Sequence, residues 1–430
     1  MDTAPPGPGR QLWKWTALAS MASYLDAGSI IAAAAGLPLW EHHLGLTPST
    51  VGLLTALSSN AISAAVGALI GGRLGDRFGR KRIYAWDLLV FAFGILWIVF
   101  AVNTPMLFVG YVVVGLAVGA DLPTSLALIA EFSPGRARGR LIGVTQVAWS
   151  LGPMVTALLA FALAPLGLLG VRIVFAHLSV VAITTWYLRR GMVESARWQR
   201  AREAVRDSGN PLAAGRVRDL FTGRNLRALL FTGGIYVLWN TVAGTAGAFL
   251  PYLLQHAGAA DQATSVGIQC LNYALTMLAV ALVFMPLSDG PRRRAVFAVG
   301  AVLQIAAFGC FAVLPLGVPV ALANVVLFGI GAAFAGESFY KLWSQEMFPT
   351  MLRGTAQGVT FAFARTLLGV WSFLVPVMIN SSFGLAGMSA AMVGMLVLFA
   401  VIGLRWMPNS AGRPLDELES EISAASRETR

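Results

Sequence analysis

Apolar segments long enough to cross a lipid bilayer recur along almost the whole of this chain, separated by short polar gaps. The hydrocarbon core of a bilayer is about 30 Å thick, and an α-helix needs about 20 residues to cross it. The segments cover residues 13–40, 49–72, 83–101, 105–131, 140–163, 168–188, 226–255, 263–287, 294–315, 318–346, 354–380 and 386–407. Because backbone in lipid must satisfy its own hydrogen bonds, they predict an all-α membrane protein with twelve transmembrane helices.

Composition and charge placement support this fold class. Hydrophobic residues make up 57% of the chain and charged residues 12%, against about 25% charged in soluble domains. The net charge is +11, but Arg and Lys are concentrated in alternate gaps between the apolar segments. The positive-inside rule places those gaps, and with them both termini, in the cytoplasm. We therefore expect a multi-pass protein of the cell membrane whose surroundings are lipid, with no binding of nucleic acid.

A long polar stretch divides the apolar segments into two groups of six. We predict a six-helix bundle over residues 1–188, a cytoplasmic linker over 189–225, a second six-helix bundle over 226–407 and a cytoplasmic tail over 408–430. In the tail, Leu415, Leu418 and Ile422 follow helical spacing. This spacing predicts a short amphipathic helix on the cytoplasmic face.

Three sequence marks recur about half a chain apart. Glu131-Phe132-Ser133-Pro134 with Arg138-Gly139 returns as Glu346-Met347-Phe348-Pro349 with Arg353-Gly354, 215 residues later. Leu74-Gly75-Asp76 and a basic run return as Leu287-Ser288-Asp289 and a basic run, 213 residues later; Met192, Ser195 and Ala196 return as Met407, Ser410 and Ala411. In an apolar chain, such parallel duplication is typical of a two-halved transporter.

A motif rich in glycine and arginine lies between the second and third apolar segments. It reads Gly71-Gly72-Arg73-Leu74-Gly75-Asp76-Arg77-Phe78-Gly79-Arg80-Lys81-Arg82. An aspartate among cations near helix ends can form charge-assisted hydrogen bonds. This ordered motif closely resembles the signature loop of the major facilitator superfamily. The resemblance extends over the whole chain, with two halves, a central loop and a weaker second copy of the motif at 287–294, and it implies that superfamily's fold.

The resemblance also implies a gate at the cytoplasmic ends of the two halves, where ion pairs form in one state and break in the other. Glu131 and Glu346 are expected to pair with arginines at the opposite helix ends. The gate set is Gly75, Asp76, Arg77, Gly79, Arg80, Glu131, Arg138, Asp289, Glu346 and Arg353. Solvent-exposed ion pairs, worth ~0–1 kcal/mol each, would suit such a switch. The alternative is a fixed, solvated set of salt bridges; the duplication favours a gate.

Charges within the apolar segments need a reason, because one near the bilayer centre costs at least about 2.5–3.5 kcal/mol. The resemblance implies that Asp26, Asp121, Glu337 and Lys341 line a central cavity. A carboxylate in a dry, changing cavity can load and release a proton, so Asp26 and Asp121 are our proton-coupling candidates. Asp121 could instead be a static partner of Arg365 or Lys341. For Glu337 we favour an i,i+4 pair with Lys341.

Some marks point to the sugar-porter group of the superfamily. Arg138-Gly139-Arg140-Leu141, followed by Gln146 and Gly152, is similar to the start of the fifth helix in sugar porters, where the glutamine contacts sugar. Glu194-Ser195-Ala196-Arg197-Trp198 resembles their sequence after the sixth helix. The chain departs from the group in three places: Tyr111 replaces an arginine, Trp239 and Asn240 replace paired glutamines, and Lys341 replaces a tryptophan, with Trp343 nearby.

Other marks separate the chain from typical sugar porters. Gly119-Ala120-Asp121-Leu122-Pro123-Thr124-Ser125 resembles a motif of proton-coupled phosphate and organic-acid symporters. In the phosphate symporters, a lysine occupies the position of Arg365. Together with Ser23-Tyr24-Leu25-Asp26-Ala27-Gly28-Ser29 and Phe339-Tyr340-Lys341-Leu342-Trp343, the Asp121 segment resembles the bacterial inositol transporters. The resemblance implies a proton-coupled importer of a polyol or sugar, with inositol first, working by alternating access as a monomer.

Polar and aromatic residues of the apolar segments supply the expected binding site. Acids, amides and Lys can bind adjacent hydroxyls, while aromatic rings cover the faces of the substrate. The substrate-binding candidates are Tyr24, Gln146, Trp149, Trp239, Asn240, Glu337, Lys341, Trp343 and Arg365. Because three acids stand against Lys341 and Arg365, the cavity has no excess positive charge, which favours a neutral substrate.

Three alternatives remain at this stage. The same fold could carry an organic acid or phosphate through Arg365, or act as a nutrient sensor without transport. An enzyme is disfavoured, because no Ser/His/Asp set, metal-ligand cluster or phosphate-binding glycine loop occurs in the sequence. Two cysteines, Cys270 and Cys310, form neither a metal set nor a disulfide framework, so we expect no metal and no cofactor.

Overall fold

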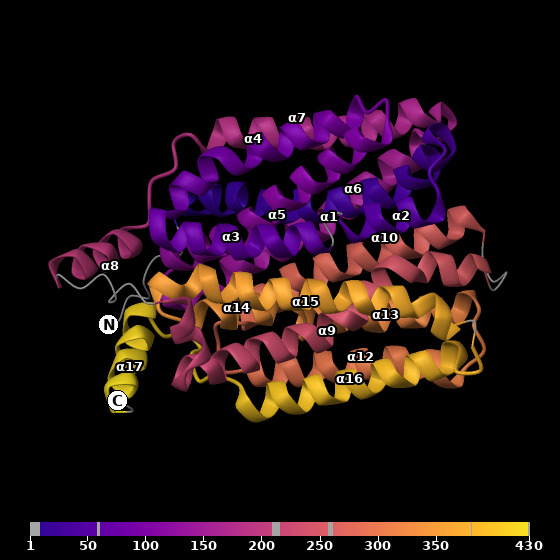
Figure 1. Cartoon of the computed structure of the whole chain (residues 1–430). Helices are drawn as coiled ribbons and strands as arrows, with labels where there is room; N and C mark the ends of the chain where they lie inside the picture. Colours follow the sequence, from indigo (N-terminus) through magenta and orange to yellow (C-terminus); the bar gives the residue numbers. More distant parts are fainter. Residues whose placement is uncertain (1–8, 58–60, 209–215, 257–260, 380, 429–430) are drawn as a thin grey trace.

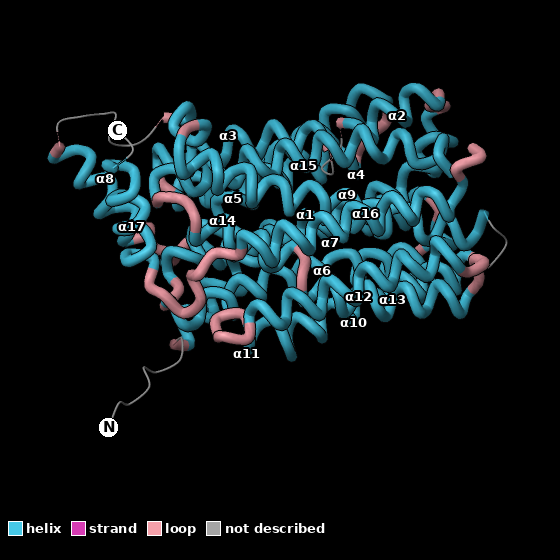
Figure 2. Tube along the Cα trace, turned by 90° about the horizontal axis from the view of Figure 1, so that it is seen from below, coloured by secondary structure: helices cyan, strands magenta, loops and turns pink. Residues whose placement is uncertain are grey.

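The computed structural model describes residues 9–57, 61–208, 216–256, 261–379 and 381–428. Within these ranges the regular structure is helical, and loops are confined to the ends of helices (Figure 2). Eleven of the described helical segments are long and apolar enough to cross a membrane. The predicted all-α membrane fold is confirmed.

The helices have the following bounds. In chain order they are α1 (Arg10–Leu44), α2 (Pro48–Ala56), α3 (Ile62–Phe78), α4 (Arg80–Val99), α5 (Thr104–Phe132), η1 (Gly135–Ala137), α6 (Arg138–Ala162), η2 (Ala164–Leu166), α7 (Leu168–Arg189), α8 (Ala196–Asp207), η4 (Val217–Phe221), α9 (Gly223–His256), α10 (Gln262–Ala279), η5 (Val280–Phe284), α11 (Met285–Leu287), α12 (Arg293–Val313), α13 (Val318–Phe334), α14 (Glu337–Glu346), α15 (Thr350–Ile379), α16 (Gly384–Trp406) and α17 (Leu415–Glu428).

The long helices form two groups that pack side by side. Helices α1 to α7, the N-terminal half, occupy one side of the molecule, and α9 to α16, the C-terminal half, occupy the other (Figure 1). The two short polar helices α8 and α17 lie together beyond one end of the bundle, where Arg197 pairs with Asp416 at 3.3 Å. Because the basic gaps gather at this end, we call it the cytoplasmic end.

The second predicted apolar segment, 49–72, is not one helix. It contains α2 and most of α3, and between them Leu57 and Ala61 have non-helical backbone angles; residues 58–60 lie outside the described residues. The Ser63 hydroxyl donates to the Leu57 carbonyl at 2.6 Å, which satisfies a backbone acceptor freed by the break. The polar run Ser58-Ser59-Asn60 interrupts the apolar residues of this segment, so the sequence did contain a signal for the break.

The tenth segment is also interrupted, at Ala335 and Gly336 between α13 and α14. The Gln304 side-chain amide of α12 donates to the carbonyl oxygens of Gly331 and Ala335, at 3.2 and 3.0 Å. The bond to Ala335 satisfies a carbonyl that a continuous helix would have used, whereas the Gly331 carbonyl also keeps its helical bond from the Ala335 N–H at 2.9 Å. The indole of Trp239 donates to Gln304 and packs against Gly336, where an added Cβ would lie 2.9 Å from the ring.

The polar tail contains the predicted amphipathic helix. Leu415, Leu418 and Ile422, the residues whose spacing predicted α17, are all buried. On its polar side, Glu419 reaches Arg353 of α15 at 2.7 Å. The tail helix is therefore packed against the cytoplasmic end of the bundle by its apolar side, as the spacing predicts.

Glycines permit backbone contact between helices at several crossings. In the N-terminal half, an added Cβ on Gly119 of α5 would lie 2.1 Å from the Ala64 carbonyl of α3. Between the halves, a Cβ on Gly72 of α3 would lie 2.3 Å from the Gly354 carbonyl of α15. Small residues at such crossings are typical of helix packing in membranes. Helix α3 is thus held closely against both its own half and the opposite half.

We expect Gly119→Ala to destabilise the fold. The new methyl group has no room beside α3, and overpacking of this kind costs typically 1–3 kcal/mol. The matched control is Gly234→Ala in α9, where a Cβ meets nothing within 4 Å. Thermal unfolding in detergent should show a lower Tm for Gly119→Ala and no loss for Gly234→Ala. Equal Tm values for the two variants would contradict the close α3–α5 contact.

Candidate functional site

A cluster of buried polar side chains occupies the interface between the two halves. Asp26 of α1 and Gln146 of α6 approach it from the N-terminal half, and Glu337, Lys341 and Arg365 of α14 and α15 approach it from the C-terminal half. All five are nearly inaccessible to solvent. We call these five residues the central cluster.

Two contacts in the central cluster cross between the halves. Arg365 lies 3.2 Å from a carboxylate oxygen of Asp26, and the Lys341 ammonium donates to the Gln146 side-chain oxygen at 3.2 Å. Lys341 also lies 3.5 Å from Glu337, one turn earlier on α14. The i,i+4 pair favoured from sequence is therefore present. Each cation is partnered from the opposite half, so separating the halves would remove these contacts.

Aromatic side chains border the central cluster. The ring of Tyr236 of α9 stacks on Tyr340 with centroids 3.8 Å apart, and its hydroxyl donates to Glu337 at 3.4 Å. Arg365 lies over the Phe361 ring, 4.7 Å from its centroid. Tyr236 is absent from the sequence-based candidates; its only sequence signal is a polar aromatic in the apolar segment that begins the second half.

The break between α13 and α14 positions the C-terminal part of the cluster. It places Glu337 in the first turn of α14, where a carboxylate is favoured by the helix dipole. Lys341 follows on the same side of α14, one turn later. In membrane transporters, interrupted helices are the usual way to bring polar groups to the middle of the bilayer.

Several predicted binding residues point away from the central cluster. Trp343 lies in an aromatic group with Phe231, Phe297 and Phe339 and is fully buried there. Trp239 bonds to Gln304 at the helix break, as described above. Tryptophan side chains of this kind mainly pack against other buried residues. Hydropathy does not indicate which side of a helix they occupy.

The remaining predicted binding residues have mixed positions. The Tyr24 hydroxyl faces His177 of α7 at 3.4 Å, inside the N-terminal half. Trp149 of α6 is half-buried and meets Tyr273 of α10 edge-on across the interface, at 6.3 Å. Asn240 is buried, and its amide nitrogen has no hydrogen-bond partner among the described residues. Of these three residues, Trp149 is the one with a contact across the interface of the halves.

A second charge cluster lies inside the N-terminal half. Asp121 of α5 pairs there with Arg189 of α7 at 3.3 Å, rather than with Arg365 or Lys341 as weighed from sequence. Asp87 of α4 lies 3.9 Å from the same guanidinium. The expectation that Asp121 lines the central cavity is thus corrected. Sequence predicts its depth in the membrane, but not which side of α5 it faces.

The cytoplasmic ends of the halves exchange charged contacts in both directions. From the N-terminal half, the Asp76 carboxylate accepts hydrogen bonds from the backbone N–H groups of Gly354 and Thr355, at 3.1 and 2.6 Å. Those groups lie in the second turn of α15, which begins at Thr350, so Asp76 sits near the N-terminus of a helix of the opposite half. Glu131 pairs with Arg80 of its own half at 2.8 Å and with Arg353 of the other at 3.3 Å.

The reverse direction repeats this pattern. Asp289 accepts from the backbone N–H groups of Gly139 and Arg140, which begin α6, at 2.7 and 3.0 Å. Burial raises the pKa of Asp289, and the two backbone hydrogen bonds oppose that rise. Glu346 pairs with Arg138 of the other half at 2.8 Å and with Arg293 of its own at 3.2 Å.

These contacts are buried, and not solvent-exposed as expected from sequence. Asp76, Arg80, Glu131, Arg138, Glu346 and Arg353 each have at most 5% of their surface accessible. A buried pair is costly to break by removal of one partner, about 3–5 kcal/mol, because an uncompensated charge remains. The cytoplasmic end is therefore closed firmly in this structure.

Three further predicted gate residues play different parts. Gly79, between α3 and α4, has a φ of 102°, and a Cβ there would lie 2.4 Å from Glu194. Glu194 in turn accepts from the backbone N–H groups of Arg80 and Lys81 at the start of α4. An added Cβ on Gly75 of α3 would lie 3.2 Å from the Thr124 hydroxyl of α5. Arg77 is exposed, and its guanidinium lies over the Phe78 ring, 5.1 Å from the centroid.

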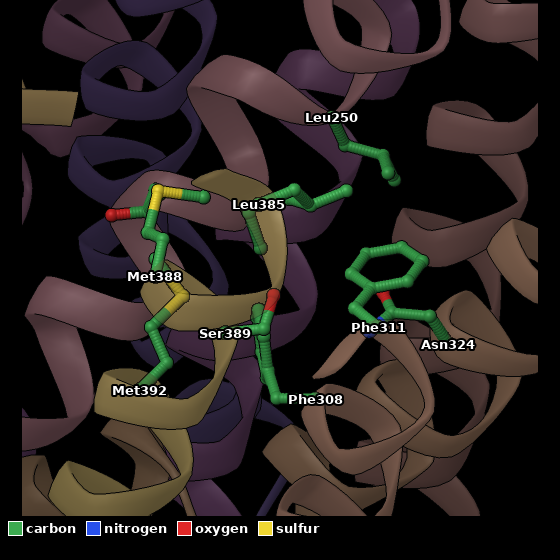
Figure 3. A pocket seen from close by; sticks show the side chains of 10 residues that line it. Leu250, Phe308, Phe311, Asn324, Leu385, Met388, Ser389 and Met392 are labelled. Atoms are coloured by element: carbon green, nitrogen blue, oxygen red, sulfur yellow. The ribbon is translucent and has the colours of Figure 1, made fainter. Parts of the chain in front are cut away.

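A separate pocket lies within the C-terminal half, away from the central cluster. Its walls come from α9, α12, α13 and α16, and they are mainly apolar (Figure 3). The labelled polar side chains are Ser389 and Asn324, and the Asn324 amide already donates to the Ala307 carbonyl at 2.9 Å. The enclosed space is about 10 Å³. It has room for about one water molecule, so it is not a site for a sugar.

Two packed helical halves, a buried polar cluster between them and reciprocal contacts at one end define a secondary membrane transporter. The family model of the Major Facilitator Superfamily matches residues 16–372. The chain belongs to this superfamily and is therefore a transporter, not an enzyme.

Known proteins of similar sequence or structure agree with the family. The chain is 42% identical to the minor myo-inositol transporter IolF of Bacillus subtilis, over 95% of this chain and 94% of that protein. It is 26% identical to the glucose transporter GlcP of Staphylococcus epidermidis, over 88% and 90%. The proton:xylose symporter XylE bound to 6-bromo-6-deoxy-D-glucose matches with a TM-score of 0.78 at 21% identity, over 95% of this chain and 98% of that one.

We expect Glu131→Gln to loosen the closed cytoplasmic end, because Arg80 and Arg353 lose the carboxylate they share. A cysteine placed at the buried Ser344, in a Cys270→Ser/Cys310→Ser background, should then react several-fold faster with an impermeant maleimide added on the cytoplasmic side. The control is Asp207→Asn, an exposed acid of α8. Unchanged reactivity in Glu131→Gln would show that this carboxylate does not hold the end closed.

Proposed function

We propose that this protein is a proton-coupled importer of a polyol or sugar, with myo-inositol as its first substrate. The central cluster carries the proposal: two acids and two cations are arranged around a glutamine at the interface of the halves. The similarity to a myo-inositol transporter over almost the whole chain supports the choice of substrate.

The chemistry of the central cluster suits a ring of hydroxyl groups. Asp26 and Glu337 accept hydrogen bonds, Lys341 and Arg365 donate them, and Gln146 does both. Neighbouring hydroxyls of a polyol can therefore replace the contacts that these side chains now make with one another. Since a site built to bond hydroxyl groups rejects analogues that lack them, the cluster also provides selectivity. Stacked Tyr236 and Tyr340 offer an apolar face for the ring carbons.

The charge count favours a neutral substrate over an anion. With Asp121 located in the other cluster, Asp26 and Glu337 stand against Lys341 and Arg365, and the formal charge of the central cluster is zero. An anion bound to Arg365 would have to displace the Asp26 carboxylate. Asp26 would then be a buried charge without a partner. The alternative, an organic-acid or phosphate symporter that uses Arg365, is therefore the weaker candidate.

Alternating access follows from the placement of the two sets of contacts. The predicted bundles 1–188 and 226–407 would rock about the central cluster, with residues 189–225 as the connection and 408–430 as the tail. The reciprocal contacts of Asp76, Glu131, Asp289 and Glu346 would then form the cytoplasmic gate. As the gate opens, water enters and solvates charges that the closed state pairs, which makes the transition reversible.

Labelled myo-inositol should accumulate in vesicles containing the protein when the outside is more acidic than the inside. Unlabelled polyols should compete, whereas phosphate and small carboxylates should not. Lys341→Met keeps much of the side-chain length but removes the donor to Gln146, so we expect a raised KM for inositol. Uptake competed by anions and not by polyols would favour the alternative substrate class.

We expect Asp121→Asn to abolish accumulation driven by a pH gradient while leaving exchange of labelled for unlabelled inositol at equal pH. The amide keeps the shape of the side chain but cannot carry a proton under these conditions. Asp26→Asn should weaken exchange as well, because Asp26 also belongs to the central cluster. Normal accumulation by Asp121→Asn would exclude Asp121 from coupling.

A further inference from the structure

Asp87 is a buried acid in the apolar part of α4 to which neither the sequence motifs nor the gate assigns a role. Its carboxylate faces the same guanidinium of Arg189 as Asp121, at 3.9 Å against 3.3 Å. Both acids are at least nine-tenths buried. Two carboxylates on neighbouring helices thus share one cation inside the N-terminal half.

Two oxygen atoms of this carboxylate pair accept no hydrogen bond from the described residues. One oxygen of each carboxylate, Oδ2 of Asp87 and Oδ1 of Asp121, has no hydrogen-bond partner among the described residues. The other oxygen of Asp87 accepts from the Leu88 backbone N–H at 2.6 Å. Buried acceptors without donors are costly, and the cost is largest for charged groups. A single bound proton would supply the missing donor.

A small cavity adjoins both carboxylates. It measures about 10 Å³, and Asp87 and Asp121 are its polar wall residues. The apolar walls include Ala22 and Leu25 of α1 and Phe91 of α4. This volume admits about one water molecule, which is enough to relay a proton and too little for an organic ligand.

Groups from α1, α4 and α5 surround the pair and Arg189 of α7. Helix α1 contributes the backbone carbonyls of Leu18 and Ala19, which accept from Arg189 at 2.8 to 3.2 Å. Helix α4 contributes Tyr84, whose ring lies 4.1 Å from the guanidinium carbon of Arg189. Helix α5 contributes Ser125, whose hydroxyl donates to the Leu122 carbonyl.

The charges in this set do not balance. Arg189, from α7, is the cation with which both acids pair, and an arginine side chain stays protonated inside proteins. Two ionised carboxylates would leave a net charge of −1 in a nearly dry site. One added proton makes the site neutral, whereas a second would leave the guanidinium unpaired. The site is therefore matched to one proton.

We propose that Asp87 and Asp121 bind one shared proton and that Asp87 is as necessary for proton coupling as Asp121. On loading, an O–H bond forms on one carboxylate as an O–H bond of a hydronium ion breaks, and the proton is hydrogen-bonded by the other carboxylate. Release to water reverses both steps. This inference rests on the proton coupling proposed above and adds a residue and a stoichiometry to it.

The contacts of Arg189 connect the pair to the substrate. Arg189 holds the carbonyls of Leu18 and Ala19, and Asp26 lies on the same helix eight residues after Leu18, about 12 Å along its axis. A proton on the carboxylate pair weakens the attraction of Asp87 and Asp121 for the Arg189 guanidinium. Arg189 can then shift, and its hydrogen bonds to the carbonyls of α1 change with it. Helices α4 and α5 also carry the Arg80–Glu131 contact at the cytoplasmic end. Loading of the proton therefore acts on both the central cluster and the gate.

Infrared titration of the purified protein tests the shared proton without any substrate. We expect a carboxylic-acid C=O band that titrates with pH in the wild type and is lost in both Asp87→Asn and Asp121→Asn. Each variant leaves one carboxylate with one guanidinium, a neutral pair that needs no proton. The control Asp207→Asn should keep the band. A band that persists in Asp87→Asn, or no titrating band in the wild type, would overturn the inference.

Transport then tests the need for Asp87. In vesicles, Asp87→Asn should lose accumulation of labelled myo-inositol under an acid-outside gradient, retain exchange at equal pH and be no more impaired when combined with Asp121→Asn. Full accumulation by Asp87→Asn, or accumulation driven by a sodium gradient alone, would contradict it. If the wild type does not accumulate inositol, the proposed function fails, whereas the infrared titration still decides the carboxylate pair. If Asp87→Asn does not fold, Asp121→Asn tests the same proton from the other side.

Discussion

The reciprocal contacts at the cytoplasmic end determine how the two halves meet. Each half places an aspartate on backbone N–H groups near the start of the fifth membrane helix of the other half, and a glutamate on that helix's arginine. Because these contacts are buried, they hold the helix ends in register and bring α3 and α15 to backbone contact. Charged groups can be released again only when water replaces the partner. These contacts therefore hold this end closed in the structure, and in the alternating access that we propose they are the contacts that water releases.

The internal repeat gives the two halves similar helices and similar contacts at the cytoplasmic end, but different buried polar residues. At the repeat offsets, Asp121 corresponds to Gly336 and Asp26 corresponds to Trp239. In the N-terminal half these positions carry acids, which belong to two different clusters. In the C-terminal half they carry a glycine and a tryptophan in mutual contact, and this contact forms the break that presents Glu337 and Lys341. Duplication thus preserves the reciprocal contacts at the cytoplasmic end, while each half builds a different part of the interior.

Sequence predicted the features that depend on composition and on repetition, namely the membrane helices, the tail helix and the pairing of Glu131 and Glu346 with arginines of the opposite half. It did not predict which side of a helix a buried charge faces, because a transmembrane helix can be apolar around its whole circumference. Asp121 was therefore assigned to the wrong cluster. Asp87 and Arg189 were missed, although a charge within an apolar segment was signal enough to consider Asp87. The interruption between α2 and α3 coincides in sequence with the polar run Ser58-Ser59-Asn60, a signal that the length of the apolar segment outweighed.

Helix α1 is the element through which proton and substrate can influence each other. Its backbone is held by Arg189 near Leu18, and its Asp26 is held by Arg365 of the opposite half. It packs on α6 so closely that a Cβ on Gly152 would lie 2.3 Å from the Tyr24 carbonyl, so the two helices must move together. Helix α6 carries Gln146 of the central cluster and begins at Arg138 of the gate. In the function that we propose, a change at the carboxylate pair that shifts α1 would therefore shift the proposed substrate ligand Gln146 and the proposed gate residue Arg138 in the same step. Coupling of this kind needs no long chain of residues, because one rigid pair of helices touches all three sites.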